Sequence, residues 1–399
     1  MTKTLKISFK FILLLIAIGS LILILNWQRA LQLYHTMTLF DEEVIVENFT
    51  HMERLFPTIE IASTSKPYYF DSKPAELPKT FLYQEEARSM DEFITRSQTT
   101  ALVIIKGDAI THESYYKGTS AEDRRISWSM SKSFLSAIFG VAVEQGAIKN
   151  LNEAVTDYVP ELMGSGYEGV SIKHVLQMSS GIHFNEDYGD FTSDINRFGR
   201  VMALGGSFDE FASELINERE PGTYLHYVSI DTHVLGMVLR KATGQNIVKY
   251  FNKYLWSEIQ PEASTLFITD TEGEPMVLGG LNMRTRDFAK FGKLYLDKGR
   301  WNGKQIIPEA WVNNSVTPGE DYLKPGKREG SDMLLGYGYQ WWIPVDADQE
   351  FMAIGIYDQF IYVNQKANVV IVKNSANRNF MDNNFESAHE SVAAFRAIA

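Results

Sequence analysis

The chain has 399 residues, of which 45% are hydrophobic and 22% charged, and its formal net charge is −12. This composition fits a globular protein of one or two domains, excludes a disordered, collagen-like or coiled-coil chain, and offers no basic surface for nucleic acid. The absence of cysteine excludes disulfides, thiolate metal sites and iron–sulfur clusters.

The first 30 residues have the pattern of a membrane anchor. Lys3, Lys6 and Lys10 precede an uncharged, apolar stretch over residues 11–27, whose 17 residues are at the short end of a bilayer span. A cleaved signal peptide is the alternative, but no small-residue cleavage site follows Leu25. We therefore predict an uncleaved signal-anchor over residues 1–30, with a transmembrane helix in the lipid bilayer.

The charge of this segment also predicts where the protein lies. Basic residues before an apolar span tend to stay in the cytoplasm, so the rest of the chain should be exported. The sequence thus predicts a single-pass protein of the cytoplasmic membrane, whose main domain is periplasmic or at the cell surface.

Residues 31–80 contain four prolines after position 56, which predicts a linker and packed arm. Residues 85–96 have helical periodicity, and a β-hairpin is expected around Gly107-Asp108, with strands at 101–106 and 109–116. A helix is expected over residues 129–145, with Gly146 following it.

The second half of the chain predicts a helical block followed by strands. Residues 147–280 are mostly helical or loop, and a terminal helix begins at Asn384. Between them lie four β-like runs, at residues 337–342, 351–353, 360–364 and 369–373. This order predicts an α+β fold for residues 81–399: a central antiparallel sheet flanked by helices, with a helical insertion at about 147–280 and a cleft between the two lobes.

The motif S-x-x-K occurs three times, at Ser63–Lys66, Ser114–Lys117 and Ser129–Lys132. Only the last begins a predicted helix, where a spacing of three places the hydroxyl and the ammonium on one face. On its own this pair is more simply a serine cap with a solvated lysine. A G-x-G-x-x-G match at residues 164–169 lacks its strand and helix, and the histidines lack metal-ligand spacing, so no cofactor or metal is expected.

Other segments accompany the third S-x-x-K pair in chain order. They include residues 175–182, Tyr227-Val228-Ser229, residues 279–282, residues 336–342 and Ala353-Ile354-Gly355. Together they resemble the serine β-lactamase and penicillin-binding-protein superfamily, in particular its class C-like branch of esterases and 6-aminohexanoate-dimer hydrolases. The resemblance covers roughly residues 45 to 399, and it implies a β-lactamase/transpeptidase-like fold.

The resemblance implies an acyl-enzyme on Ser129, with Lys132 as its base and Tyr227 as a proton relay. The backbone N–H groups of Ser129 and Ile356 are expected to form an oxyanion hole. Substrate contacts are implied for four further residues: Tyr188, Ser229, Asn282 and Gly355.

One departure from the family pattern bears on the substrate. Ala353-Ile354-Gly355 stands where the superfamily has Lys-[Ser/Thr]-Gly, so the cation and the hydroxyl are both lost. The sequence therefore predicts a membrane-tethered serine hydrolase acting on small ester or amide substrates. The alternatives are a D-Ala-D-Ala peptidase or β-lactamase, or a non-catalytic binding or sensor protein on this scaffold.

Overall fold

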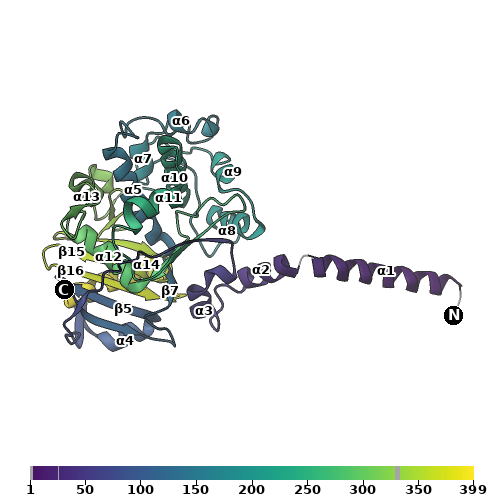
Figure 1. The fold of residues 1–399 in the computed structure, drawn as a ribbon, viewed down its shortest axis with the longest axis horizontal. Coiled ribbons are helices and arrows are strands. Elements are labelled where there is room, and N and C mark those ends of the chain that lie inside the picture. Colours follow the sequence, from purple (N-terminus) through teal and green to yellow (C-terminus); the bar gives the residue numbers. More distant parts are fainter. Residues whose placement is uncertain (1–2, 26, 329–332) are drawn as a thin grey trace.

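The structure, a computed structural model, describes residues 3–25, 27–328 and 333–399. Its main body is an α+β domain built on an eight-stranded sheet with the order β12-β13-β14-β15-β16-β5-β6-β2 (Figure 1). Both ends of the chain supply its centre, as predicted, through these strands: β5 (Thr99–Lys106), β6 (Ala109–Tyr115), β14 (Glu350–Gly355), β15 (Gln359–Asn364) and β16 (Val369–Ser375). The edge strand β2 (Asp71–Ser72) pairs with β6 in parallel, whereas the other neighbours are antiparallel.

Side chains on β5 alternate between two buried layers, which is the pattern of a strand covered on both faces. Leu102 and Ile104 pack with α4 (Met90–Arg96) and α14 (Asp382–Ile398). Val103 and Ile105 instead belong to the larger core with α12 (Thr285–Leu296). The sheet is thus held between helices, and the ends of its strands are fixed in place.

Residues 147–280 form most of a helical lobe that packs on α5 (Ser131–Glu144). Its helices are α6 (Val155–Tyr158), α7 (Ile172–Leu176), α8 (Asp194–Leu204), α9 (Phe208–Ser213), α10 (Ser229–Thr243) and α11 (Ile247–Phe251). Gly146 has a φ of 74° and takes the left-handed conformation predicted for the residue after α5. The long helices α5 and α10 pack against each other, and the 3₁₀ turn that precedes α5 contacts β14 and β15 of the sheet.

A second, four-stranded sheet was not predicted. It joins β1 (Thr58–Ile61) of the arm to β8 (Thr265–Ile268), β9 (Leu281–Arg284) and β7 (Arg124–Ile126). The remaining short elements are α2 (Trp27–Met37), α3 (Ile45–Thr50), β10 (Arg300–Trp301), β11 (Lys304–Gln305) and α13 (Glu309–Ser315). Apolar side chains of the arm enter the main core, including those of Leu39, Ile45, Phe49, Met52 and Phe56.

Two local predictions are wrong in part. The first half of the helix predicted at 85–96 belongs to a hairpin of β3 (Thr80–Tyr83) and β4 (Glu86–Ser89), because Gln84 and Glu85 adopt positive φ values of 51° and 66°. The strand predicted at 337–342 is a tight reversal between β12 (Gly336–Tyr337) and β13 (Trp342–Ile343). Here Gly338 lies so close to the Ser315 carbonyl that a Cβ atom would be 2.0 Å from its oxygen.

The predicted transmembrane helix is also wrong. Among the residues that the structure describes, no helix is both long and apolar enough to cross a bilayer. The helix α1 is described from Lys3 to Leu25. This finding also overturns two predictions that depended on a spanning helix. They are the contact with the bilayer through residues 11–27 and the single-pass location in the membrane.

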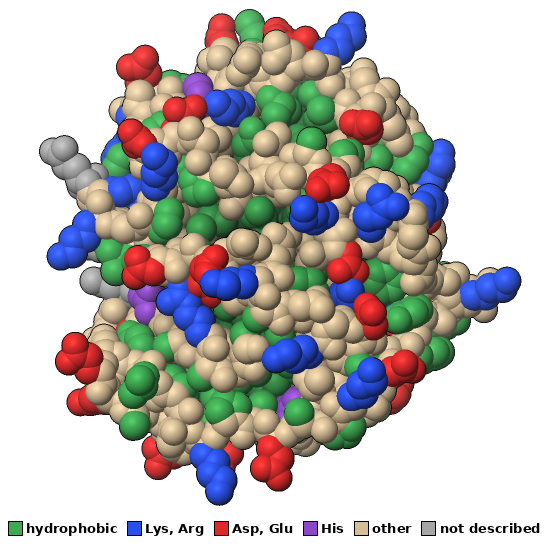
Figure 2. Space-filling view, turned by 90° about the vertical axis from the view of Figure 1, so that its left-hand side faces the viewer, with side chains coloured by type: hydrophobic (Ala, Val, Ile, Leu, Met, Phe, Trp, Pro, Cys, Tyr) green, Lys and Arg blue, Asp and Glu red, His purple; other side chains and the backbone are tan. Residues whose placement is uncertain are grey.

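Figure 2 shows one face of the molecule. Lys and Arg side chains are interspersed with Asp and Glu side chains across it, and small apolar areas lie between them. The charge on this face is therefore mixed rather than gathered into an area of one sign.

Candidate active site

Ser129 and Lys132 lie at the start of α5. Ser129 is the central residue of a short 3₁₀ turn (Trp128–Met130) that runs directly into the helix. The Nζ atom of Lys132 lies 3.0 Å from Ser129 Oγ. The lysine side chain is only 1% exposed, so it is not the solvated lysine of the simpler interpretation.

Two further groups hold the Lys132 side chain. Its Nζ donates to the carbonyl oxygen of Leu278 at 2.8 Å and to Ser229 Oγ at 3.2 Å. Ser229, the first residue of α10, in turn donates its hydroxyl to Glu186 Oε1 at 2.5 Å and its backbone N–H to Glu186 Oε2 at 3.2 Å. A hydrogen-bonded chain thus connects Ser129 to Glu186 through Lys132 and Ser229.

The burial of Lys132 changes its protonation. Loss of solvent lowers the pKa of Lys132 to about 7, although the negative charges of Glu186 and Asp231 oppose the shift. An ordinary lysine, with a pKa near 10.4, is neutral in only about one molecule in 2,500 at pH 7. Near neutral pH, therefore, a large fraction of Lys132 has a free lone pair beside the serine hydroxyl.

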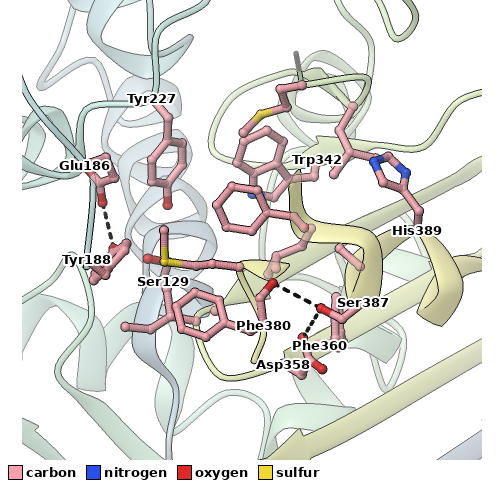
Figure 3. Close-up of a pocket in the computed structure, with 18 of the residues that line it drawn as sticks. Ser129, Glu186, Tyr188, Tyr227, Trp342, Asp358, Phe360, Phe380, Ser387 and His389 are labelled. Atoms are coloured by element: carbon pink, nitrogen blue, oxygen red, sulfur yellow. Dashed lines mark hydrogen bonds between the residues drawn. The ribbon is translucent and has the colours of Figure 1, made fainter. Parts of the chain in front are cut away.

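Tyr227 lies in the loop before α10, and the Met178 carbonyl anchors this loop by accepting the His226 N–H at 2.9 Å. The Tyr227 ring stacks on Trp342 with 5.2 Å between centroids. Its hydroxyl points toward Ser129 (Figure 3). Burial, followed by the charge of Glu186, raises the pKa of Tyr227, whereas a hydrogen bond with Ser129 opposes the shift. The phenol therefore stays protonated and can donate a proton.

A cavity of about 450 Å³ opens beside Ser129. Its wall is mostly apolar and comes from the loop before α10, from β13 to β15 and from the region before and at the start of α14 (Figure 3). Prominent lining residues are Leu225, Tyr227, Trp342, Ile354, Phe360 and Phe380. Tyr188 lines it too and donates its hydroxyl to Glu186 Oε1 at 2.7 Å.

The end of β14 comes very close to the turn that carries Ser129. A Cβ atom on Gly355 would lie 2.4 Å from the carbonyl oxygen of Ser127 and 3.1 Å from Trp128 Cβ. Only glycine permits this close approach of β14 to the turn. Ser129, Gly355 and Ile356 all line the same cavity.

The structure does not bring every predicted residue to the cavity. Asn282 is buried in β9, where its side-chain amide donates to the Gly280 carbonyl at 2.9 Å, and it is not among the described lining residues. Ser229 reaches Lys132 instead of the cavity wall. Glu186 was missed, because the acidic stretch around Tyr188 gives no sign of which carboxylate faces inward.

The cavity wall is poor in positive charge. Ile354 lines it, and no lysine or arginine is among its described lining residues, whereas Glu186, Asp187 and Asp358 are. Within the described ranges of the chain, no cluster of three or more His, Asp or Glu side chains is arranged to hold a metal ion.

Comparison with known proteins defines the class of this fold and site. A model of the family described as Beta-lactamase matches residues 87–394. The chain belongs to this family and is a serine hydrolase of the β-lactamase type, which confirms the resemblance to the serine β-lactamase and penicillin-binding-protein superfamily.

Two individual relatives match most of this chain. A 6-aminohexanoate-dimer hydrolase of Paenarthrobacter ureafaciens is 28% identical over 295 residues, covering 72% of this chain and 75% of the relative. A solved structure from Bacillus anthracis, provisionally described as a 6-aminohexanoate-dimer hydrolase, has a TM-score of 0.79 at 24% identity and covers 90% of this chain and 95% of that one.

More distant structures share the fold. A penicillin-binding protein from Bacillus halodurans has a TM-score of 0.57 at 14% identity, over 76% of this chain and 99% of the other. Because one fold carries different activities, the substrate has to be argued from the cavity itself.

Proposed function

We propose that the chain hydrolyses small neutral esters or amides through an acyl-enzyme on Ser129. The observation that carries this proposal is the Ser129–Lys132 pair: a 3.0 Å contact to an almost fully buried amine whose pKa falls to about 7. A serine hydroxyl becomes a useful nucleophile only when an adjacent base accepts its proton. The short contact and the lowered pKa support Lys132 as that base.

The proton path follows from the contacts of Lys132. In its neutral form Nζ has two N–H bonds, which match its acceptors on Leu278 and Ser229, and one lone pair, which is left for the Ser129 hydroxyl. As Ser129 Oγ attacks the substrate carbonyl, its proton passes to Lys132. Tyr227 then donates a proton to the departing oxygen or nitrogen and is reprotonated from Lys132. In the second half-reaction a water molecule gives a proton to Lys132 as it attacks the acyl carbonyl. The acyl–Oγ bond then breaks, the carboxylic acid is released, and Ser129 Oγ receives a proton back, which restores the free enzyme.

Negative charge develops on the substrate carbonyl oxygen in the transition state, and hydrogen-bond donors held in fixed positions stabilise it. The backbone N–H groups of Ser129 and Ile356 would supply them, and a donor of this kind typically contributes about 2.7–4 kcal/mol to the barrier reduction. Backbone donors do not depend on side-chain identity, so the replacement of Lys-[Ser/Thr]-Gly by Ala353-Ile354-Gly355 leaves this role available.

The wall of the cavity favours an uncharged substrate. A carboxylate next to the scissile bond would meet Ile354 and lose its hydration without a cation in return. Apolar chains instead gain contact with the aromatic side chains around the cavity. A neutral ester or amide is therefore the substrate class that fits best.

Covalent labelling tests the proposal. A fluorophosphonate or an activated ester should add one adduct per chain, and peptide mass spectrometry should locate it on Ser129. An unlabelled chain, or a label on another residue, would mean that Ser129 is not the nucleophile and would favour a binding or sensor protein.

The pH dependence of kcat/KM should reflect Lys132. Because the neutral amine is the active form, kcat/KM for a neutral p-nitrophenyl ester should rise with pH through about 7 and then level off. The negative charge of Glu186 raises the pKa of Lys132. In Glu186→Gln, which keeps an oxygen acceptor for Ser229, the midpoint should therefore move to lower pH.

Asp190→Asn is the matched control for that shift. Asp190 lies on the same loop, and among the described residues its carboxylate accepts hydrogen bonds from Thr192 alone, so the loss of its charge should leave the midpoint where it is. A midpoint that moves upward in Glu186→Gln, or equally in both variants, would contradict the assignment of Lys132 as the titrating base.

A further inference from the structure

Four aromatic rings meet behind the proposed oxyanion hole. Phe40 and Phe49 come from the arm, Trp128 directly precedes the serine, and Tyr357 directly follows Ile356. The Phe49 ring lies 5.5 Å from that of Trp128 and 5.3 Å from that of Tyr357. Phe40 stacks on Tyr357 at 4.9 Å and lies 5.9 Å from Trp128. The arm therefore touches both backbone turns that would hold the oxyanion.

Both of these turns contain bulky residues in the left-handed region of φ. Trp128 has a φ of 43°, and Tyr357 and Asp358 have φ values of 61° and 64°. Large side chains adopt this conformation only where the surrounding structure holds them there. The strain is thus concentrated on the residues beside the two proposed donors.

The Tyr357-Asp358 turn is held on its other side by polar contacts. Asn377 Nδ2 donates to Asp358 Oδ2 at 2.7 Å, and Ser387 Oγ donates to Asp358 Oδ1 at 2.9 Å. The buried Lys373 lies 3.9 Å from the same carboxylate. Asp358 is therefore fixed from within the domain. The Tyr357 ring packs on Phe380 of the domain at 4.8 Å as well as on the two rings of the arm.

We propose that the arm braces the oxyanion hole: Phe40 and Phe49 are positioning residues that fix the spacing of the two turns through Trp128 and Tyr357. This inference rests on the proposed function, because it assumes that the N–H groups of Ser129 and Ile356 face the oxyanion. Oxyanion donors act only within a narrow range of distances, and a displacement of about 1 Å can reduce turnover a hundredfold. A segment that is distant in sequence from Ser129 would thereby contribute to the rate.

The test uses Phe40→Ala and Phe49→Leu in the full chain. Phe40 is 37% exposed, so its loss should disturb the fold little, and leucine keeps apolar bulk at the buried position 49. We expect kcat for a p-nitrophenyl ester to fall about tenfold while KM changes less than twofold. The affinity for phenylboronic acid, which forms a tetrahedral adduct with a serine hydroxyl, should fall by a similar factor.

Two further variants separate positioning from stability. Phe40→Tyr keeps the ring and should restore both kcat and boronate affinity. Phe56→Ala removes an arm ring that is 3% exposed, close to the 4% of Phe49, but that makes no ring pair with Trp128 or Tyr357 among the described residues. It should lower Tm while kcat and boronate affinity stay within twofold of the wild type.

The outcomes distinguish the two proposals. If the wild type hydrolyses the ester and binds the boronate, but Phe40→Ala and Phe49→Leu behave like it, the brace is wrong and the proposed function stands. An equal loss in Phe56→Ala would also overturn the brace, since it would show a general effect of the arm on stability. If the wild type neither hydrolyses esters nor binds the boronate, the proposed function fails, and the brace fails with it.

Discussion

Ser129→Ala should reduce ester hydrolysis to the background rate, a loss of at least about 10³-fold in kcat, because no acyl-enzyme can form without the hydroxyl. Lys132→Ala should cause a comparable loss, since the remaining hydroxyl would have no base within reach. Tyr227→Phe keeps the ring stacked on Trp342 but removes the acid, so we expect a loss of about 10²-fold or more. Initial rates with a p-nitrophenyl ester measure all three.

A double variant tests whether Ser129 and Lys132 act as one catalytic unit or contribute independently to the rate. Residues that act together lose function together, so Ser129→Ala/Lys132→Ala should be no slower than Ser129→Ala alone. Near-wild-type turnover in Ser129→Ala would show that another group is the nucleophile.

Ser131→Ala provides a matched control on the same helix. Ser131 is more deeply buried than Ser129, and its hydroxyl has no hydrogen-bond partner among the described atoms. Its removal deletes an unsatisfied polar group, which is neutral or stabilising. Activity and Tm should therefore stay close to those of the wild type, and a large loss would indicate that the start of α5 tolerates no change at all.

Contacts between residues that are close in the sequence can be predicted from it more readily than contacts between distant segments. Ser129 and Lys132 are three residues apart at the start of a predicted helix, so the spacing made their contact possible. The spacing alone fitted a serine cap with a solvated lysine better, and only the resemblance to a family pointed to a catalytic pair. The position of Tyr227, almost 100 residues later, came only from the resemblance to a family. The contact of Glu186 with Ser229 has no sequence signal, because several carboxylates nearby are equivalent in the sequence and only the folded loop selects one.

The same reasoning explains the errors in the fold. Periodicity predicted a helix over residues 85–96, but it does not detect two consecutive left-handed residues such as Gln84 and Glu85. The apolar run after Lys10 met the lower limit of length for a span, but among the described residues no helix is both long and apolar enough to cross a bilayer. The role of Phe40 and Phe49 could not be inferred either, since arm residues acquire neighbours only when distant turns meet.

Neutral esters should be hydrolysed far faster than β-lactams. The family pattern implies that the Lys and Ser/Thr of Lys-[Ser/Thr]-Gly bind the carboxylate beside the scissile amide, through charge-assisted hydrogen bonds of about 1.5–3 kcal/mol each. Ala353 and Ile354 cannot make these bonds. Loss of two such bonds corresponds to about 10²- to 10⁴-fold in kcat/KM.

The measurement compares kcat/KM for a p-nitrophenyl ester with that for a chromogenic cephalosporin, using the same enzyme preparation and pH. Intrinsic reactivity differs between the two substrates, so each rate is divided by its uncatalysed hydrolysis rate.

Ile354→Thr, which returns one hydroxyl to the cavity wall, should shift the ratio of the two kcat/KM values toward the cephalosporin while leaving the ester rate largely intact. Because the described lining residues include three carboxylates and no lysine or arginine, a single hydroxyl should recover only part of the difference. A wild-type chain that hydrolyses the cephalosporin as efficiently as the ester would disprove this selectivity, and it would show that the cavity binds the carboxylate by some group other than the missing Lys-[Ser/Thr]-Gly pair.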